Sequence, residues 1–153
     1  MFDSNFYPTP DNIISKLVSG ISFGKQTRIL EPSAGKGNIC NYILQNFGSH
    51  KPEYFKQIIH CIEKNFELQG ILKSNGFKVV DTDFLTYDCE VSYSLILMNP
   101  PFDHADKHLL KAIEIRQGAE IRCLYPTESI NNPYSKERQL ALRLIEQNNG
   151  TIK

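Results

Sequence analysis

Two short stretches of this sequence combine residue types that can bind and orient a small polar group. The first is Asn99-Pro100-Pro101-Phe102, which follows Met98 and the apolar run 95–97. Neither proline can donate a hydrogen bond to a sheet, so a strand must end here, and the residue before each proline is held extended. The stretch therefore presents an amide, backbone carbonyls and an aromatic ring on a stiff backbone. It does so at the carboxyl end of a buried strand, where open α/β sheets bind ligands.

The second stretch is the glycine-containing sequence Glu31-Pro32-Ser33-Ala34-Gly35-Lys36-Gly37, between a strand-like run and a helical pattern. It is not a phosphate-binding P-loop, because the spaced first glycine and the Ser or Thr after the lysine are missing. It is not a dinucleotide-binding fingerprint either, because Cys40 stands where that motif has its third glycine. Glycines allow a ligand to approach the backbone closely, and the acid suits an ammonium group or ribose hydroxyls. The pattern fits a cationic, zwitterionic nucleoside such as S-adenosylmethionine. The alternative is a tight turn whose glycines serve geometry only.

The elements that position these stretches alternate along the chain. Apolar runs predict strands near residues 28–31, 57–63, 77–80, 93–98 and 120–126, and helical patterns lie between them. Thr9 is expected to cap a helix whose first residue is Pro10, and residues 151–153 resemble the start of a sixth strand. This alternation predicts a doubly wound, mostly parallel α/β sheet. If the first and fourth strands are neighbours, the two stretches face each other across one crevice.

Two further strand ends carry acids. Glu63 ends the second strand, where folds of this type bind ribose hydroxyls, although it also fits a solvated loop carboxylate. After the third strand, Asp83 can accept a hydrogen bond from an exocyclic amine and Phe84 can cover an adenine face, while Asp81 is a competing acid. Asp106, His104 and His108 are expected to be capping and surface residues near a helix start, without a metal.

Composition limits the class of protein. The chain has 153 residues, 41% of them hydrophobic, which is sufficient for one domain with its own core. Its 17 acidic and 17 basic residues balance, so an extended phosphate-binding face is not expected. The four cysteines lack C-x-x-C spacing, which favours reduced thiols in a cytoplasmic protein. No run of residues is long and apolar enough to predict a membrane span, so no membrane partner is expected.

The order of these stretches resembles that of the class I S-adenosylmethionine-dependent methyltransferases, and within them the DNA amino-methyltransferases with an Asn-Pro-Pro-Phe motif. The resemblance extends over nearly the whole chain, because Phe6-Tyr7-Pro8-Thr9-Pro10 is similar to the N-terminal cofactor-binding motif and residues 31–37 to the glycine motif. It implies a Rossmann-like fold. It implies cofactor contacts from Tyr7, Thr9, Pro10, Glu31, Pro32, Ser33, Ala34, Gly35, Gly37, Glu63, Asp83 and Phe84, and catalytic roles for Asn99, Pro100, Pro101 and Phe102.

The resemblance further implies methyl transfer from S-adenosylmethionine to N6 of adenine in DNA, as in restriction–modification enzymes. The Asn99 side-chain oxygen and the Pro100 carbonyl would accept the two N–H bonds of the amino group, and Phe102 would stack on the base. The base must leave the duplex to reach them. Cytosine C5 methylation is disfavoured because it needs a nucleophilic cysteine, and no Pro-Cys pair stands here.

Other acceptors stay open. Related motifs act on nitrogen atoms of ribosomal RNA or of protein glutamine, usually with Tyr in place of Phe102. Residues 1–153 are expected to form a single catalytic domain that lacks its last strands and has no separate target-recognition domain. The chain therefore also fits an inactive fragment, or an enzyme completed by a partner subunit that supplies target recognition.

Overall fold

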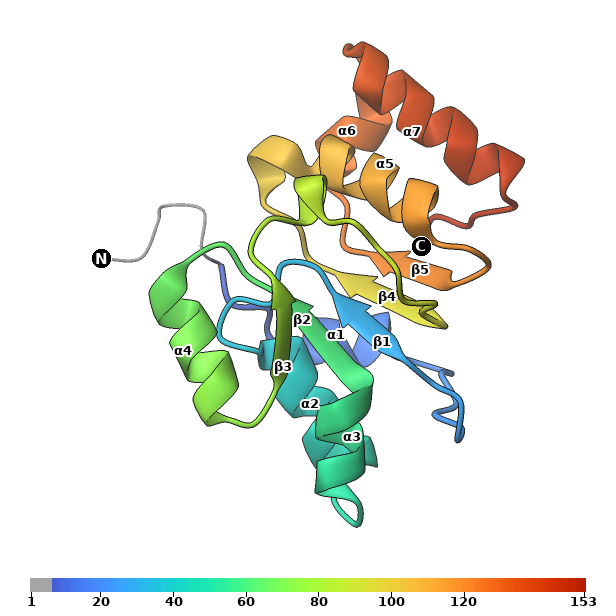
Figure 1. Ribbon diagram of the computed structural model, residues 1–153. Helices are drawn as coiled ribbons and strands as arrows, with labels where there is room; N and C mark the ends of the chain where they lie inside the picture. The colour runs from blue at the N-terminus through green and yellow to red at the C-terminus, as the bar shows by residue number, and fades with distance from the viewer. Residues whose placement is uncertain (1–6) are drawn as a thin grey trace.

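A five-stranded parallel sheet forms the middle of the molecule (Figure 1). The computed structural model describes residues 7–153, and within them the strand order is β3-β2-β1-β4-β5. The strands are β1 (Ile29–Glu31), β2 (Ile59–Ile62), β3 (Lys78–Asp81), β4 (Leu95–Met98) and β5 (Glu120–Cys123). All of their pairings are parallel, so every strand presents its carboxyl end at the same edge of the sheet. The predicted doubly wound α/β fold is confirmed.

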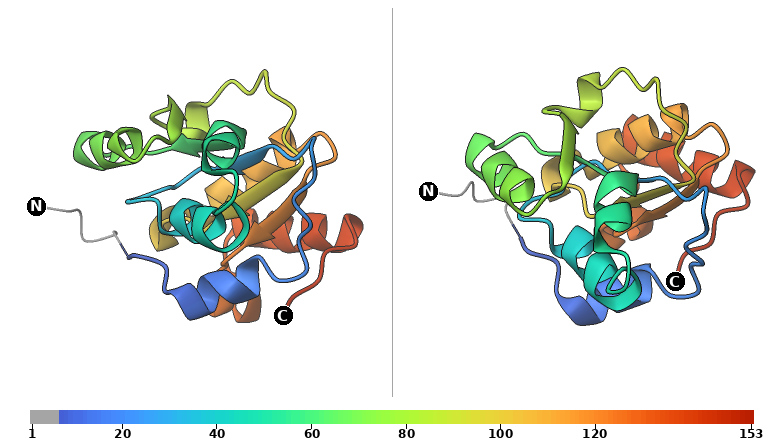
Figure 2. Two further views of the ribbon diagram at one scale, coloured as in Figure 1. Left: turned by 90° about the horizontal axis from the view of Figure 1, so that it is seen from below. Right: turned by 60° about the horizontal axis from the view of Figure 1, so that its bottom comes forward.

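Helices cover both faces of this sheet. They are α1 (Asp11–Leu17), α2 (Asn38–Phe47), α3 (Pro52–Ile58), α4 (Phe66–Ser74), α5 (Ala105–Ile115), α6 (Thr127–Asn131) and α7 (Lys136–Gln147), with short 3-10 helices η1 (Phe84–Thr86) and η2 (Phe102–His104). Helices α1 and α2 lie side by side, as both views of Figure 2 show. Helices α5, α6 and α7 group together near β4 and β5. None of the helices within residues 7–153 is long and apolar enough to cross a membrane.

Strand β4 shows why the sheet has two cores. Its four residues are all buried, and successive side chains of a strand point to opposite faces. Leu95 and Leu97 pack into the core formed with α1, α2 and α3, whereas Ile96 and Met98 pack into the core formed with η1 and α5. A continuous apolar run is therefore what a central parallel strand requires, because both of its faces are covered.

The chain reverses its direction across the sheet at β1. Strand β1 pairs with β2 on one side and with β4 on the other, where Leu30 lies opposite Ile96. The first and fourth strands are therefore neighbours, which is the condition under which the sequence places the two stretches at one edge. The chain after β1 leads to α2 on one face and the chain after β4 leads to α5 on the other, so the boundary between these strands is the topological switch point of the sheet.

Three sequence expectations were wrong in detail. The N-cap of α1 is Pro10 without a side-chain cap, so Thr9 lies outside the helix. The second strand begins at Ile59 instead of residue 57, because residues 52–58 form helix α3. Pro52 lies in the first turn of this helix, where proline is favoured. Residues 151–153, expected to begin a sixth strand, form no strand or helix. In each case a short local pattern fits two structures, and packing decides between them.

Candidate functional site

Asn99 stands at the switch point, one residue beyond the end of β4. Its side-chain nitrogen Nδ2 donates a hydrogen bond of 2.8 Å to the Oγ1 atom of Thr9. Thr9 is buried although it belongs to the segment before α1, and α1 is anchored in the core through Ile14 and Leu17. The contact fixes the orientation of the Asn99 amide. Since the nitrogen is engaged by Thr9, the side-chain oxygen Oδ1 is the acceptor that this amide can offer to a ligand.

The two prolines after Asn99 give this edge its shape. Pro100 is buried, and Pro101 is half-buried with φ −55° and ψ 132°. The backbone then turns into η2, where the carbonyl of Pro101 accepts a 3.0 Å hydrogen bond from the His104 amide. The preceding strand end is held as well, since the Met98 carbonyl accepts from the Leu124 amide. The predicted stiff strand end is thus a short, fully defined turn.

Two exposed aromatic rings lie beside this turn. The ring centroids of Tyr7 and Phe102 are 5.9 Å apart, with an interplanar angle of 33°. Both residues are largely exposed, at 63% for Tyr7 and 59% for Phe102. Offset aromatic pairs at this spacing are favourable, and exposed rings leave surface free for stacking on a planar ligand. Phe6, named with Tyr7 in the sequence motif, lies outside the described residues.

The glycine turn after β1 is built around the carboxylate of Glu63. Gly35 and Gly37 have φ of +56° and +86°, a conformation that glycine adopts without a steric penalty. The amide of Gly35 donates to Glu63 Oε2 over 2.7 Å, and the amide of Asn65 donates to Oε1 over 2.8 Å. The neighbouring Ala34 amide donates to the carbonyl of Ile62. Two loops from adjacent strands therefore share one anion, which lies at the carboxyl edge of the sheet.

Glu31 differs from its expected role as an open carboxylate. It is only 3% exposed, and its Oε2 accepts a 2.9 Å hydrogen bond from the Cys40 thiol of α2. Burial, together with the nearby negative charge of Glu63, raises the pKa of Glu31 to about 8. Pro32 beside it is buried too. The turn therefore carries one hydrogen-bonded anion, Glu63, and one buried acid that is protonated at neutral pH in the ligand-free chain.

The loop after β3 also differs from expectation. The Oδ1 atom of Asp83 accepts from the Leu85 amide at the start of η1, and its Oδ2 lies 3.9 Å from the Lys64 ammonium. Phe84 is 2% exposed and belongs to the core, where its ring packs against that of His108 at 5.6 Å. In this structure Phe84 does not offer an open ring face. The next residue, Leu85, is half-buried.

His108 was expected on the surface and is instead buried. Its Nδ1 lies 3.3 Å from Ser33 Oγ, so it joins the glycine turn to α5. Burial lowers the pKa of His108 to about 4, which keeps the imidazole neutral at pH 7. The sequence did contain a signal for this position. His108 shares helical spacing with Ala105, Leu109 and Ala112, which are the other buried residues of α5.

Two groups of the predicted residues lie at the carboxyl edge of the sheet. The first consists of Asn99, Pro100, Pro101 and Phe102, and it is joined by Tyr7 and Thr9, for which the resemblance implied cofactor contacts instead. The second is the glycine turn with Glu63. A turn that already holds a carboxylate repels a pyrophosphate but suits a cation and hydroxyl groups. The site can therefore hold a cationic nucleoside at the glycine turn and orient a planar, hydrogen-bonding group at Asn99.

Comparisons with known proteins agree with this reading at the level of the fold. No protein-family model matches the sequence, and no curated protein matches it significantly. Solved structures do match. A predicted N6-adenine-specific DNA methylase from Listeria monocytogenes str. 4b F2365 has a TM-score of 0.60 at 13% identity, over 84% of this chain and 47% of that chain.

Two methyltransferases with other acceptors are similar as well. The glycopeptide N-methyltransferase MtfA in complex with S-adenosylhomocysteine has a TM-score of 0.56 at 10% identity, over 80% of this chain and 51% of that chain. Coclaurine N-methyltransferase, bound to N-methylheliamine and S-adenosylhomocysteine, has a TM-score of 0.55 at 13% identity, over 72% of this chain and 34% of that chain. The chain therefore has the fold of the S-adenosylmethionine-dependent methyltransferases. It spans about half or less of the length of these proteins.

Proposed function

We propose that this chain is the catalytic domain of a methyltransferase that uses S-adenosylmethionine to methylate N6 of adenine in DNA. The observation that carries the proposal is the Asn99 amide, held by Thr9 at the end of β4, the strand that pairs with β1 ahead of the glycine turn. When bound, S-adenosylmethionine supplies a methyl group on a positively charged sulfur. Transfer from such a group is an in-line displacement, so orientation of the acceptor accounts for much of the catalysis.

The glycine turn is proposed to bind the cofactor. The Glu63 carboxylate is the hydrogen-bond acceptor that lies at the turn, and it retains lone pairs for ribose hydroxyls after it accepts from Gly35 and Asn65. Glu31 is proposed to respond to the cofactor's positive charge, because a cation nearby lowers the pKa of a buried acid. Asp83, in the loop between β3 and η1, is the proposed acceptor for the adenine amine of the cofactor.

The turn after β4 is proposed to bind the acceptor amine. Asn99 Oδ1 and the Pro100 carbonyl would accept its two N–H bonds, which orients the nitrogen lone pair and stabilises the positive charge that develops on it. Phe102 would stack on the base, and Tyr7 would extend that apolar surface, because the two rings already lie side by side. A base in this position has left the duplex.

A second candidate acceptor is a planar nitrogen of RNA or of a protein glutamine. Of these two, the protein acceptor is favoured by a small hollow of about 200 Å³ beside Phe102, which is lined from Asp103 onward. Three carboxylates, from Asp103, Asp106 and Glu137, line it together with His104 and Lys107. Carboxylates repel the phosphates of a nucleic acid and attract a basic peptide. For DNA as substrate, we propose that a partner subunit supplies the contacts to phosphate and the target recognition.

Transfer of labelled methyl from S-adenosylmethionine to unmethylated DNA, RNA and protein separates these acceptors. We expect label in DNA, recovered as N6-methyladenine after digestion, and a loss of at least about a hundredfold in Asn99→Ala. Asn46→Ala is the matched control, because Asn46 is exposed on α2, away from the site. Label found in RNA or protein alone would contradict DNA methylation. Full activity of Asn99→Ala would contradict the assigned catalytic residue.

Cofactor binding is measured separately by calorimetry with S-adenosylmethionine. We expect binding by the pure chain, with the release of a proton from Glu31 when the positively charged cofactor enters. Binding without transfer to any acceptor would favour an enzyme that needs its partner. No binding would contradict the proposed cofactor site itself.

A further inference from the structure

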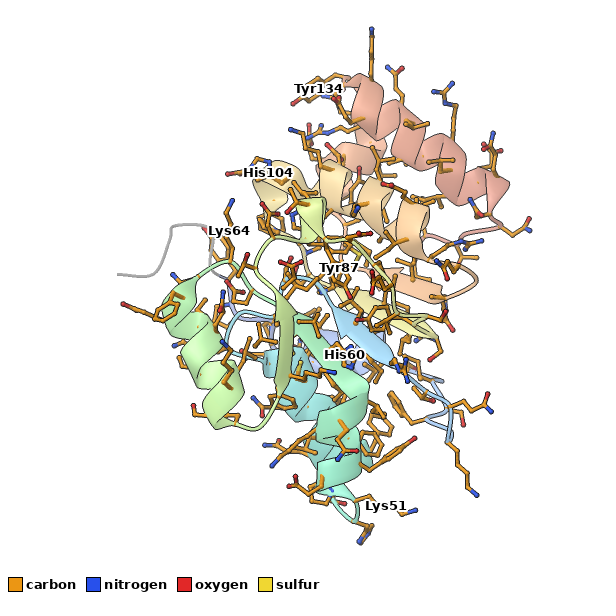
Figure 3. All side chains as sticks on the ribbon, viewed as in Figure 1. Lys51, His60, Lys64, Tyr87, His104 and Tyr134 are labelled. Carbon is orange, nitrogen blue, oxygen red and sulfur yellow. The ribbon has the colours of Figure 1, made fainter. Side chains whose placement is uncertain are left out.

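A hollow in the described part of the chain lies away from the proposed methyl-transfer site. It has a volume of about 660 Å³ and is formed by the segment before β1, the end of α2 and the start of α3. These segments lead into β1 and β2, so they lie at the amino ends of the parallel strands. Figure 3 shows Lys51 of this region at the opposite end of the molecule from His104 and Lys64.

Aromatic rings form the wall of this hollow. Phe23 lies 4.7 Å from Phe47 and 5.8 Å from Phe55 between ring centroids, and Tyr54 meets Phe55 edge to face. Phe47 is 43% exposed although it is the last residue of α2 and part of this cluster. An exposed ring on a packed aromatic base offers a stacking surface at a low entropic cost.

Basic residues form the rim. Lys25, His50 and Lys51 line the hollow and are exposed, and none of the lining residues within 7–153 is acidic. The acid nearest in sequence, Glu53, pairs with Lys56 over 3.3 Å, so its charge is balanced locally. The whole chain has no net charge, which makes a rim of one sign a local property. Such a rim attracts an anion.

The hollow is formed before any ligand binds. Gly24 donates to Thr27 Oγ1 over 2.8 Å, and its carbonyl accepts from the Thr27 amide, so the rim loop is closed on itself. The Tyr54 hydroxyl lies within 3.2 Å of the carbonyl oxygens of Gly24 and Lys25 and ties that loop to α3. On the other side, a Cβ atom at Gly48 would lie 2.7 Å from Phe55, so glycine is required for this close packing.

We propose that this hollow is a second binding site, for a small aromatic anion of the nucleotide class. Its volume falls in the usual range for small-molecule sites, about 300–1,000 Å³. Aromatic wall and basic rim match the two parts of a nucleoside monophosphate, a planar ring and a phosphate. A long acidic peptide fits less well, because the hollow is compact and the rim has few cations. The site is independent of the proposed methyl transfer, since it shares no residue with that edge.

Amide NMR spectra of the full chain test this assignment. Thymidine monophosphate is titrated with excess S-adenosylhomocysteine present, so that a nucleoside cannot report on the cofactor edge. The two control ligands are thymidine, which has the ring but no phosphate, and inorganic phosphate, which has no ring. We expect the amides of residues 21–25 and 47–51 to shift. Thymidine monophosphate should bind on the order of tenfold more tightly than either fragment.

Variants then assign the contacts. Lys25→Ala combined with Lys51→Ala should weaken binding of thymidine monophosphate on the order of tenfold, whereas Lys73→Ala combined with Lys136→Ala should leave it unchanged. Phe47→Leu keeps an apolar side chain but loses the ring, so this variant should bind thymidine monophosphate no more tightly than inorganic phosphate. Shifts confined to other loops, equal binding of inorganic phosphate, or tighter binding of an oligoglutamate peptide would each overturn the proposal.

Discussion

Asn99 and Thr9 are 90 residues apart in the sequence, yet the amide nitrogen of Asn99 donates to the hydroxyl oxygen of Thr9 over 2.8 Å. The contact joins the segment before α1 to the end of β4. It restrains the amide from rotating, and it selects which end of that amide faces a ligand. An acceptor oxygen that is fixed before the ligand arrives requires less ordering when the ligand binds. The first prediction follows from this contact.

Thr9→Val should lower the rate of methyl transfer about tenfold, which corresponds to one hydrogen bond of about 1–2 kcal/mol. Valine has a similar volume and shape but cannot accept the Asn99 N–H bond. The turnover number should fall while the affinity for S-adenosylmethionine, measured by calorimetry, stays within about twofold, because the contact acts on the acceptor side. Thr9→Ser keeps the hydroxyl and should retain most of the activity. An equal loss in both variants would assign Thr9 to packing alone.

Phe102→Leu should raise the KM for DNA without lowering the melting temperature. The ring is 59% exposed and pairs with Tyr7, so its loss costs little folding energy. Stacking on a base is worth about 1–3 kcal/mol, so the KM should rise about tenfold or more. Phe66→Leu is the matched control, since Phe66 is 84% exposed at the start of α4. An unchanged KM in Phe102→Leu would contradict a stacking role.

Glu63→Gln should weaken the binding of S-adenosylmethionine on the order of tenfold or more. Both oxygens of Glu63 accept backbone N–H bonds, from Gly35 and Asn65. A glutamine amide has one oxygen, so its NH₂ group must face one of these N–H groups and disturb the turn. Calorimetry measures the affinity, with Glu67→Gln on the exposed side of α4 as control. Equal affinity in the two variants would show that the Glu63 charge is not needed.

The stability of the ligand-free chain should fall between pH 6.5 and 8 because of Glu31. Its pKa is about 8 in the fold and 4.5 when exposed, so the folded state binds the extra proton in that interval. Each pH unit then costs up to about 1.4 kcal/mol of unfolding free energy. His60 and His108 affect stability at lower pH, because burial lowers both of their pKa values from 6.5 to about 4. Between these two values their contribution makes the unfolding free energy rise with pH.

Urea unfolding at pH 6.5, 7.25 and 8 measures this slope. In Glu31→Gln the side chain is neutral in both states, so the decline with pH should disappear and the variant should be more stable than the parent at pH 8. Glu90→Gln, at an exposed loop position, is the control and should retain the decline. Parallel slopes in all three proteins would contradict a protonated Glu31 in the fold.

The strands were accessible from the sequence to a large extent, whereas their order in the sheet was not. The run Leu95 to Met98 is apolar throughout because β4 is covered on both faces. Pro100 and Pro101 end this strand whatever its position in the sheet, because neither can donate a backbone hydrogen bond. Helices α3 and α6 were not predicted. Helix α3 has seven residues and α6 has five, which is too short for a clear helical period.

Among the site residues, too, some could be predicted from the sequence and others could not. Glu63 could be associated with the glycine turn because an acid at the end of the second strand meets the loop of the first in any parallel sheet of this order. Local sequence could not show that Phe84 turns into the core, nor that His108 contacts Ser33. Both depend on how α5 packs against η1, and such packing joins residues that are distant in the chain.

The sequence by itself determined the alternation of strands and helices, the end of β4 at its prolines, and the chemistry of the amide, acids and rings at the strand ends. These follow from local backbone and side-chain properties. Only the tertiary structure decided that Thr9 holds Asn99 instead of capping α1, that Tyr7 lies beside Phe102, and that Glu31 is buried while Glu63 holds the glycine turn. Each of these depends on which distant segments pack together, and that is set by the burial of both sheet faces.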